Sequence, residues 1–393
     1  MEKIVLVINS GSSSIKFSLI NISSNTTIIT GMAEKLGLAN ATMHIKHDGN
    51  KEDIALEGND HAAAMQSLSN VLQQKKLSNI ITAIGHRVVH GGEKFKTATI
   101  INNEVISAIE DCALFAPLHN PANLLGIRVA MKAAPHLPQV AVFDTAFHQT
   151  LPEHAYLYAV PIQWYKEFSV RRYGFHGTSH QYVAQQAANL LELPLSNSAF
   201  ITVHLGNGAS AAAILNGRSI DTTMGFTPLE GLVMGTRSGD IDPGLYPYIG
   251  KVLQLDAEQV ADLLNKKSGL LGLSDLSSDV RELQDAAASG HEGAQLALKV
   301  FVYRLAKYIG ALTVTLPHLD ALVFTGGIGE NSVMIRSMVL DYLQVLGYKT
   351  DTDKNKAAVG GRQAIITTTN SAKAIVINTN EELMIALETA SLL

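Results

Sequence analysis

Val5-Leu-Val-Ile-Asn9-Ser-Gly11-Ser-Ser-Ser14-Ile-Lys16-Phe-Ser-Leu19 is the stretch that decides the fold. Its first residues are apolar and β-branched, which is typical of a buried strand. Ile15–Leu19 then alternates apolar and polar side chains, as a half-buried strand does. The two runs predict a hairpin whose tip carries Asn9, Gly11 and a cluster of serine hydroxyls. This tip is either an anion site, built from backbone N–H groups and hydroxyls, or an ordinary Ser/Gly turn.

A second stretch repeats this pattern about half a chain length later. The strand-like run Ala199–His204 enters Leu205-Gly-Asn-Gly-Ala-Ser210, and the apolar run Ala211–Leu215 follows. A unit repeated at this distance predicts two related α/β domains, each of which contributes one phosphate-facing turn. Strands that alternate with helices along the rest of the chain predict mixed sheets.

Composition limits the partners that we expect. Hydrophobic residues make up 47% of the 393 residues and charged residues 17%, with a net charge of −5 and no basic block. We therefore expect no nucleic acid partner. The single cysteine, Cys112, excludes an internal disulfide, favours a reducing compartment, and lies in an expected helix that argues against a catalytic thiol. No signal-peptide pattern follows Met1 and no apolar run approaches about 20 residues, so we expect a cytoplasmic protein without a membrane partner.

Proline and polar residues between 148 and 161 predict a domain boundary. We expect an N-terminal domain of residues 1–148 plus 382–393, which holds the first hairpin and a closing helix. Residues 149–381 then form a nucleotide-binding and dimerisation domain. Periodicity predicts helices at 60–76, 103–115, 123–133, 256–266, 279–288 and 293–316, and further strands at 79–85, 139–143, 320–325 and 373–378.

The glycine-rich segment Gly326-Gly-Ile-Gly-Glu-Asn-Ser332 joins an expected strand to a helix. The chain lacks a P-loop sequence, and Ser332 stands where the dinucleotide fingerprint needs a third glycine. The remaining alternatives are a backbone that approaches a base, sugar or phosphate closely, and a merely tight connection.

Arg87 and Arg237 are each expected in a loop flanked by glycines, one in each expected domain. The planar guanidinium holds carboxylate or phosphoryl oxygens in pairs. Two such groups would neutralise charge in phosphoryl transfer, whereas the alternative for each arginine is a structural ion pair.

Two histidine pairs, His86 with His90 and His176 with His180, have the spacing of a helical zinc site. Their surroundings are rich in glycine or β-branched residues and lack the intervening glutamate of zinc proteases. We therefore favour a hydrogen-bonding or transition-state role for one of these imidazoles over a metal site.

Three carboxylates are candidates for the site. Asp144 ends an expected buried strand, where catalytic or Mg²⁺-linked carboxylates are common. Thr379 and Glu382 have capping-box spacing, which would turn Glu382 back onto its helix and leave Glu381 free for a metal. Thr178 and Gln181 have the same spacing, which predicts another capped helix.

Taken together, these segments resemble the acetate kinase family of the actin/hexokinase/Hsp70-like ATPase superfamily. The resemblance rests on Asn9–Lys16, Gly85–Gly92, Pro117–Pro121, Val142–His148, Tyr173–His180, His204–Gly208, Gly235–Asp240, Phe324–Asn331 and Thr379–Glu382. It implies two actin/hexokinase-like (ribonuclease H-like) domains around a central nucleotide cleft. It also implies a homodimer and reversible, Mg²⁺-dependent, direct in-line transfer of the ATP γ-phosphate to acetate, giving acetyl phosphate and ADP, with Mn²⁺ as a possible substitute metal.

The same resemblance implies roles for individual residues. Asn9 and Glu381 help to place Mg²⁺. The nucleotide-binding residues are Ser12, Ser14 and Lys16 of the first hairpin, His204, Asn207 and Gly208 of the second, and Asp279, Val280, Arg281, Gly327, Gly329 and Asn331. Arg87 and Arg237 hold the carboxylate and the transferring phosphoryl group, near Asn207. His176 steadies the transition state, and Asp144 supports Mg²⁺ or orients its partners. Val89, Leu118, Phe175 and Pro228 form an apolar slot for the substrate methyl group.

This slot bears on the substrate. One methylene is worth about 1–3 kcal/mol of discrimination in a filled pocket. Val89 is bulkier than the alanine expected in a relative built for propionate, so acetate is favoured over propionate and butyrate. The alternatives are a propionate or butyrate kinase of the same family and, more remotely, a nucleotide-switched actin/Hsp70-like binding protein, which would give no reason for the arginine pair.

Overall fold

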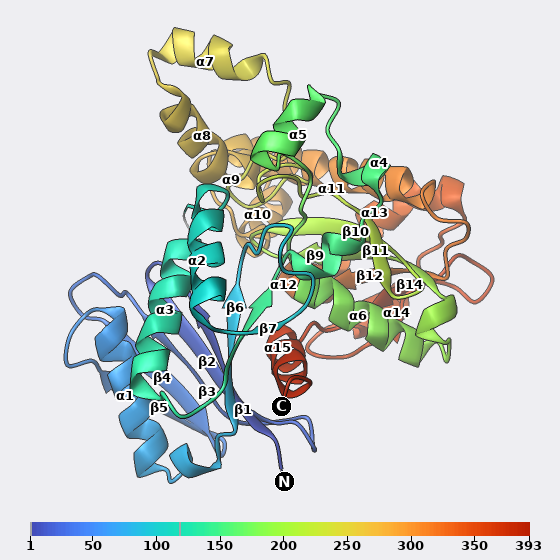
Figure 1. Ribbon diagram of the computed structural model, residues 1–393. Coiled ribbons are helices and arrows are strands. Elements are labelled where there is room, and N and C mark those ends of the chain that lie inside the picture. Colours follow the sequence, from blue (N-terminus) through green and yellow to red (C-terminus); the bar gives the residue numbers. More distant parts are fainter. Residues whose placement is uncertain (1, 118) are drawn as a thin grey trace. The chain divides into compact units, whose positions relative to one another are not determined.

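The computed structural model describes residues 2–117 and 119–393 and divides into two compact units (Figure 1). Unit 1 runs to Phe147 and takes in Asn380–Leu393, and unit 2 is His148–Thr379. The domain borders expected from the sequence, after residues 148 and 381, lie one and two residues from these division points.

Unit 1 is built on an eight-stranded sheet in the order β5-β4-β3-β2-β1-β6-β8-β7. Its strands are β1 (Ile4–Ser10), β2 (Ser14–Asn21), β3 (Thr26–Glu34), β4 (Thr42–His47), β5 (Asn50–Ala55), β6 (Ala83–Val88), β7 (Thr99–Ile100) and β8 (Gln139–Phe143). β1 pairs antiparallel with β2 and parallel with β6, which confirms the predicted first hairpin. The apolar run of β1 is buried, as its pattern predicted.

Four α-helices belong to unit 1 in its described part: α1 (His61–Gln74), α2 (Asn103–Asp111), α3 (Asn120–Ala133) and α15 (Glu381–Ala390). α15 contacts β1, β6 and β8 although it comes from the far end of the chain. Gly85 in β6 permits this close packing, because a Cβ there would lie 2.4 Å from Oγ1 of Thr389. The helix predicted at 103–115 changes to a 3₁₀ turn at Cys112–Leu114, and α3 begins earlier than predicted, with Pro121 in its first turn.

Unit 2 contains a six-stranded sheet in the order β11-β10-β9-β12-β14-β13. The strands are β9 (Ala199–Leu205), β10 (Ala209–Leu215), β11 (Arg218–Thr222), β12 (Ala321–Thr325), β13 (Ala364–Ile365) and β14 (Ala374–Val376). β9 pairs antiparallel with β10 and parallel with β12, as β1 does with β2 and β6. The two units thus repeat one strand pattern, and both hairpins turn at comparable places.

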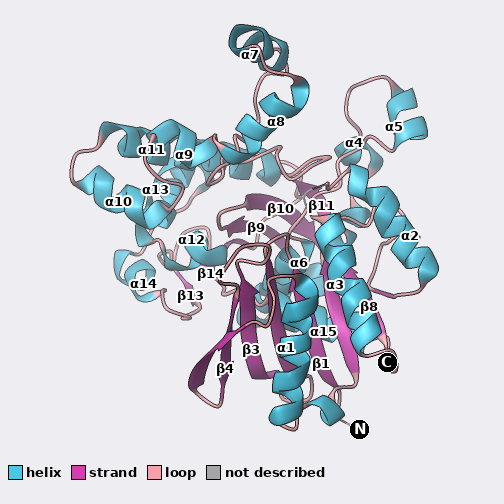
Figure 2. Ribbon diagram, turned by 90° about the vertical axis from the view of Figure 1, so that its left-hand side faces the viewer, coloured by secondary structure: helices cyan, strands magenta, loops and turns pink. Residues whose placement is uncertain are grey.

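Unit 2 also contains helices that lie around its sheet and, at the top of Figure 2, helices that extend away from it. They are α4 (Glu153–Tyr156), α5 (Ile162–Phe168), α6 (Gly177–Leu190), α7 (Leu245–Leu253), α8 (Ala257–Lys266), α9 (Gly269–Ser274), α10 (Val280–Ala288), α11 (Glu292–Thr313), α12 (Gly326–Asn331), α13 (Val333–Tyr342) and α14 (Thr352–Ala357). The glycine-rich segment predicted as a turn is itself the short helix α12. Both α6 and α12 contact β9, so the loop that follows β9 lies among helix ends. No helix in residues 2–117 and 119–393 is long and apolar enough to cross a membrane.

Candidate functional site

Arg87 forms the central ion pair of unit 1. It lies on β6, so the sequence-based placement in a loop was wrong. Its Nη2 donates to Oδ2 of Asp144 at 2.7 Å and its Nε to Oδ1 at 3.0 Å. The Asp144 side chain is 2% exposed and that of Arg87 23% exposed. Burial lowers the pKa of Arg87, but the charges of Asp144 and Glu381 outweigh burial and raise it. The guanidinium therefore stays charged and is held in one orientation.

The start of α15 differs from the prediction. Asn380, not Thr379, caps this helix, and its side chain accepts a hydrogen bond from the N–H of Leu383. The expected capping box is therefore wrong. Glu382 instead accepts a hydrogen bond of 2.5 Å from Ser18 on the sheet. Glu381 lies close enough to Arg87 for its negative charge to raise the pKa of the guanidinium.

The first hairpin presents a tight tip in unit 1. The N–H of Gly11 donates to the carbonyl of Ser14 at 2.8 Å, and Nε2 of His61 contacts the carbonyl of Gly11 at 2.7 Å. Ser12 and Lys16 are exposed at this tip. The backbone of the tip is thus held while its hydroxyl and ammonium groups are left accessible.

Two asparagines that the sequence reasoning left without a role support this region. Asn123 joins the hairpin to the segment after β6: it donates to the carbonyl of Ser10 at 2.7 Å and accepts from the N–H of Val89 at 3.1 Å. Asn120 bonds both the N–H and the carbonyl of His90. Both asparagines are buried. Asn120 lies within the Pro117–Pro121 motif and Asn123 lies just after it, and this position was the sequence signal that could have indicated their role.

In unit 2, a chain of hydrogen bonds holds His176. This residue has a left-handed backbone (φ 57°), which is uncommon outside glycine and often marks functional sites. Its Nδ1 lies 2.8 Å from Oγ of Ser210, and that oxygen also contacts Nε2 of His180 at 2.8 Å. The His176 ring stacks on His204 with centroids 4.4 Å apart. Burial lowers the pKa of His180 well below its usual value, so His180 acts as a neutral support.

The prediction for the N-terminus of α6 was wrong about its cap. His176 rather than Thr178 stands at its N-cap, and Oγ1 of Thr178 has no hydrogen-bond partner in the described part of the chain. The capping box predicted for Thr178 and Gln181 is therefore absent. In the His86/His90 pair, His86 makes a hydrogen-bonding contact within the fold. It lies on β6, and its Nε2 is 2.8 Å from Oε1 of Gln139.

Arg237 lies beside the second hairpin. The N–H of Gly235 donates to the carbonyl of Asn207 at 2.9 Å, which ties the two loops together. A Cβ on Gly208 would lie 3.4 Å from Nη1 of Arg237 and 3.5 Å from the His176 ring. Nη1 of Arg237 donates to the carbonyl of Pro228 at 3.2 Å. No carboxylate within residues 2–117 and 119–393 forms an ion pair with Arg237, and burial lowers its pKa.

A cavity of about 550 Å³ adjoins this hairpin in unit 2. It is lined by Gly206, Asn207, Ser278, Asp279, Val280, Arg281, Gln284, Gly327, Ile328, Asn331 and Ser332. Gly326, which precedes the lining residue Gly327, packs closely against the end of β9: its φ is +75°, and a Cβ there would lie 2.7 Å from the carbonyl oxygen of Leu205. The structure therefore brings most of the sequence-predicted nucleotide residues of unit 2 into one cavity.

The remaining predicted residues are less concentrated. Val89 in unit 1 and Phe175 in unit 2 are buried, whereas Pro228 is partly exposed and contacts Arg237 through its carbonyl. Leu118 lies outside the described residues. Asp279 and Arg281 form an ion pair of 2.6 Å at the start of α10, with the arginine largely exposed.

Known proteins resemble the chain over nearly its whole length. The acetokinase family matches residues 4–387. An acetate kinase of Chromobacterium violaceum is 56% identical over 392 residues, which cover 100% of this chain and 99% of that protein. An acetate kinase of Deinococcus radiodurans is 52% identical and covers 98% of this chain and 97% of its own length.

Solved structures agree with this relationship. A propionate kinase of Francisella tularensis matches with a TM-score of 0.96 at 44% identity, covering 100% of both chains. The acetate kinase of Porphyromonas gingivalis matches with a TM-score of 0.93 at 43% identity, covering 99% of both chains. The fold is thus the α/β, actin/hexokinase-like fold that the sequence predicted. On the strength of its sequence, its fold and these relatives, the chain belongs to the acetokinase family.

Proposed function

We propose that this chain is an acetate kinase, which reversibly transfers the γ-phosphate of ATP to acetate and yields acetyl phosphate and ADP. The observation that carries the proposal is Arg237: a partly buried guanidinium beside the second hairpin, without a carboxylate partner in the described part of the chain. Such a charge is costly to bury unless an anion meets it. A phosphoryl or carboxylate group supplies that anion.

In unit 2, the cavity along Asn207, Asp279–Arg281 and Gly327 receives the nucleotide in our proposal. Backbone close to α12 fits a flat base and a sugar, since glycines let a ligand approach. The nucleotide phosphates extend toward Asn207 and Gly208. There Arg237 and His176 meet the phosphoryl group, and Ser210 holds His176 in orientation.

In unit 1, Arg87 holds an oxygen of the substrate or of the phosphoryl group, and Asp144 keeps the guanidinium in place. Ser12, Ser14 and Lys16 face the terminal phosphates. Phosphoryl transfer depends mainly on positioning and charge stabilisation, which these groups provide.

The donor set of unit 1 fits Mg²⁺. Asn9 and Glu381 offer amide and carboxylate oxygens, and Mg²⁺ prefers oxygen ligands, with one or two carboxylates beside substrate phosphates. Both residues belong to unit 1, and Asp144 is already engaged by Arg87. When bound, Mg²⁺ (with Mn²⁺ as a substitute) would neutralise phosphate charge; Asn9 and Glu381 would hold it.

The acceptor needs no strong base. A carboxylate is ionised at neutral pH, so its oxygen attacks the γ-phosphorus directly and in line while the bond to the ADP oxygen breaks. No phosphorylated enzyme forms. The assignment of Val89, Leu118, Phe175 and Pro228 to a slot for the methyl group rests on the family resemblance alone. The bulk of Val89 favours acetate over propionate and butyrate.

A hydroxamate assay with ATP, Mg²⁺ and a carboxylate tests the activity, because acyl phosphates react with hydroxylamine. We expect acyl hydroxamate from acetate and a higher kcat/KM for acetate than for propionate or butyrate. If none of the three acids gives hydroxamate, the proposal is refuted. ATP hydrolysis that is equal with and without acetate would favour a nucleotide-switched binding protein instead.

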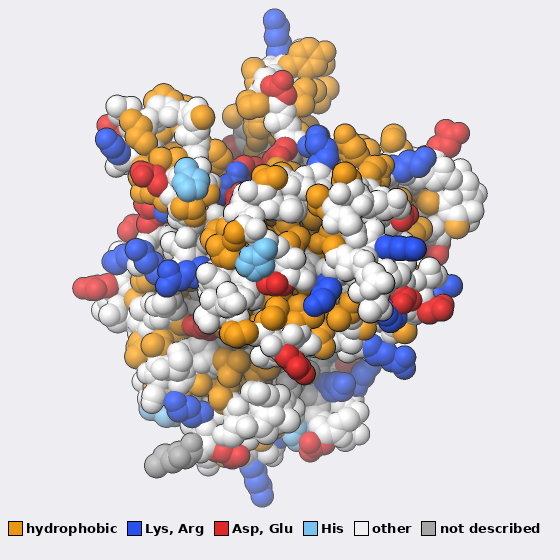
Figure 3. All heavy atoms as spheres, turned by 90° about the vertical axis from the view of Figure 1, so that its right-hand side faces the viewer, with side chains coloured by type: hydrophobic (Ala, Val, Ile, Leu, Met, Phe, Trp, Pro, Cys, Tyr) orange, Lys and Arg blue, Asp and Glu red, His pale blue; other side chains and the backbone are white. Residues whose placement is uncertain are grey.

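A homodimer and a cytoplasmic location belong to the same proposal. Helix α7 exposes Leu245, Tyr248, Val252 and Leu253, and hydrophobic side chains gather on its part of the surface at the top of Figure 3. A second copy would cover this face. The free, buried Cys112 is compatible with a reducing compartment. Multi-angle light scattering checks the dimer, and Leu253→Glu should shift it toward a monomer.

A further inference from the structure

The hydroxyl of Tyr158 closes the loop Phe226–Glu230 in unit 2. It accepts a hydrogen bond from the N–H of Phe226 at 2.8 Å and donates one to Oε2 of Glu230. One phenol thus holds both ends of this loop. Gly225, just before the loop, leaves room for the phenol, because a Cβ there would overlap Oη of Tyr158 and Oε2 of Glu230. Burial raises the pKa of the phenol, so its hydroxyl keeps the proton that it donates.

Arg172 anchors the same loop to the sheet of unit 2. Its Nη2 donates to Oε1 of Glu230 at 2.6 Å, so each oxygen of this carboxylate has its own partner. Its Nη1 donates to the carbonyls of Thr222, Thr223 and Met224, at the end of β11 and just after it, at 2.9, 3.1 and 3.2 Å. The side chains of Arg172 and Glu230 are 18% and 30% exposed, so water and salt screen this pair less than a surface pair. Charge-assisted hydrogen bonds therefore fix the position of Glu230.

The position of this loop bears directly on Arg237. Pro228 lies in the middle of the loop, and its carbonyl accepts the hydrogen bond of 3.2 Å from Nη1 of Arg237. The other acceptor of Nη1 in the described part of the chain is Sδ of Met234 at 3.8 Å, and a thioether accepts only weakly. The orientation of this guanidinium therefore depends on where the loop places the carbonyl of Pro228.

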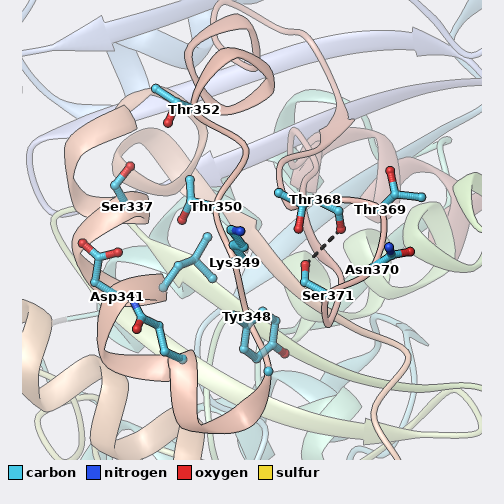
Figure 4. Close-up of a pocket in the computed structure, with 13 residues that line it drawn as sticks. Ser337, Asp341, Tyr348, Lys349, Thr350, Thr352, Thr368, Thr369, Asn370 and Ser371 are labelled. Atoms are coloured by element: carbon cyan, nitrogen blue, oxygen red, sulfur yellow. Dashed lines mark hydrogen bonds between the residues drawn. The ribbon is translucent and has the colours of Figure 1, made fainter.

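The buried hydroxyls of Tyr348 and Thr350, also in unit 2, have no such connection. Both residues belong to the polar lining of a solvent-open hollow between α13 and residues 347–350 and 368–371 (Figure 4). Their hydroxyl oxygens lie below the surface and have no hydrogen-bond partner in residues 2–117 and 119–393. Neither hydroxyl can therefore orient another side chain through a hydrogen bond, whereas that of Tyr158 can.

We propose that Tyr158 is a positioning residue: its hydroxyl fixes the loop Phe226–Glu230 and thereby keeps Arg237 oriented toward the anion that it meets. This role rests on the proposed function, in which that anion is the phosphoryl or carboxylate group. Tyr158→Phe removes one hydroxyl and keeps the ring, so the N–H of Phe226 and Oε2 of Glu230 lose their shared partner. Loss of a hydrogen bond to a charged group shifts an equilibrium about 10-fold or more, and only molecules with the guanidinium in place are competent.

A double-mutant cycle with Arg237→Ala tests this role in the hydroxamate assay with ATP, Mg²⁺ and acetate. We expect Tyr158→Phe to lower kcat/KM about 10-fold in the wild-type chain and about twofold or less in Arg237→Ala, where no guanidinium remains to be oriented. A purely structural role would lower kcat/KM by the same factor in both chains. The matched control is Tyr156→Phe, which should leave kcat/KM within about twofold of the wild type. Its hydroxyl comes from the same segment but meets the hydroxyl of Tyr165, at 3.4 Å, rather than the loop.

Hydrogen exchange measured by mass spectrometry gives a readout that does not depend on activity. The peptide that contains Phe226 should exchange faster in Tyr158→Phe than in the wild type or in Tyr156→Phe. Glu230→Gln weakens the same link from its other side and keeps the test open should Tyr158→Phe fail to fold; its cost should also vanish in Arg237→Ala. The proposal is overturned if Tyr158→Phe keeps the wild-type kcat/KM, if it costs as much in Arg237→Ala as in the wild type, or if exchange of the loop is unchanged. A wild-type chain that forms no acyl hydroxamate contradicts the proposed function instead, and exchange of the loop then decides whether Tyr158 holds it.

Discussion

The ion pair between Arg87 and Asp144 yields a prediction that separates stability from catalysis. Arg87→Ala removes the guanidinium and leaves a carboxylate whose side chain is 2% exposed. Removing one partner of a buried pair costs about 3–5 kcal/mol. Because water reaches the 23% exposed side of Arg87, we take the lower end, about 3 kcal/mol. Differential scanning calorimetry should show a fall in Tm of about 6–12 °C, given about 2–4 °C per kcal/mol for a unit of this size.

The double variant Arg87→Ala/Asp144→Ala completes the cycle. It removes both charges, so it should recover part of the lost stability and unfold at a higher temperature than Arg87→Ala. Its activity should not recover. Loss of a charge donor to the transition state costs about 100-fold or more in turnover, and both variants lack that donor. The hydroxamate assay measures this loss.

A matched control uses the exposed pair of Lys266 and Asp262, whose side chains are 54% and 61% exposed at a distance of 2.8 Å. Lys266→Ala should change stability by about 0.5 kcal/mol or less and leave turnover intact. The reasoning is refuted if the double variant is no more stable than Arg87→Ala. Near-normal turnover of Arg87→Ala would remove this arginine from the proposed chemistry.

Three further predictions concern other residues. Arg237→Ala should reduce kcat/KM by about 100-fold while Tm stays close to the wild type, since no carboxylate is stranded; a large loss of Tm would show a structural role instead. Burial lowers the pKa of His86 to about 4, and a histidine that stays neutral in the fold but protonates when unfolded weakens the fold in acid. The free energy of unfolding should therefore be unaffected by His86 above about pH 6.5 and fall by about 3 kcal/mol as pH decreases to 4, a slope that His86→Gln should flatten. Burial raises the pKa of the Cys112 thiol to about 11, so a thiol reagent at pH 8 should label the folded chain slowly and the unfolded chain quickly; fast labelling of the folded chain would contradict its buried position.

Local sequence patterns predicted much of the fold. The strand predicted at 139–143 has those bounds in β8, and the helix predicted at 256–266 is α8, which begins one residue later. Both hairpins appear where alternation and glycine placed them. These signals are reliable because they depend on near neighbours in the chain and on which face of an element is buried.

Predictions that depended on distant partners were weaker. The capping box predicted at Thr379 and Glu382 had the correct spacing. In the structure, however, Glu382 accepts a hydrogen bond from Ser18, which lies on a strand far away in the sequence. Arg87 was expected in a loop because of neighbouring glycines, and pairing with β1 and β8 places it on a strand. The Pro117–Pro121 motif beside Asn123 marks the region, but no spacing in the sequence indicates that Asn123 bonds the carbonyl of Ser10.

By itself, then, the sequence determined the α/β class, the repeated hairpins and the family, because periodicity and short motifs are local properties. Only the tertiary structure decided how the charges and polar groups are paired. It gave Arg87 a carboxylate partner and Arg237 none in the described part of the chain. In the same part of the chain it left the hydroxyls of Tyr348 and Thr350 buried without a hydrogen-bond partner. The first hairpin, Asn9–Lys16, illustrates both cases. Its turn could be predicted from the local sequence, whereas the residues that hold the turn, His61 and Asn123, come from distant parts of the chain. Long-range packing chooses such partners, and no spacing along the chain encodes them.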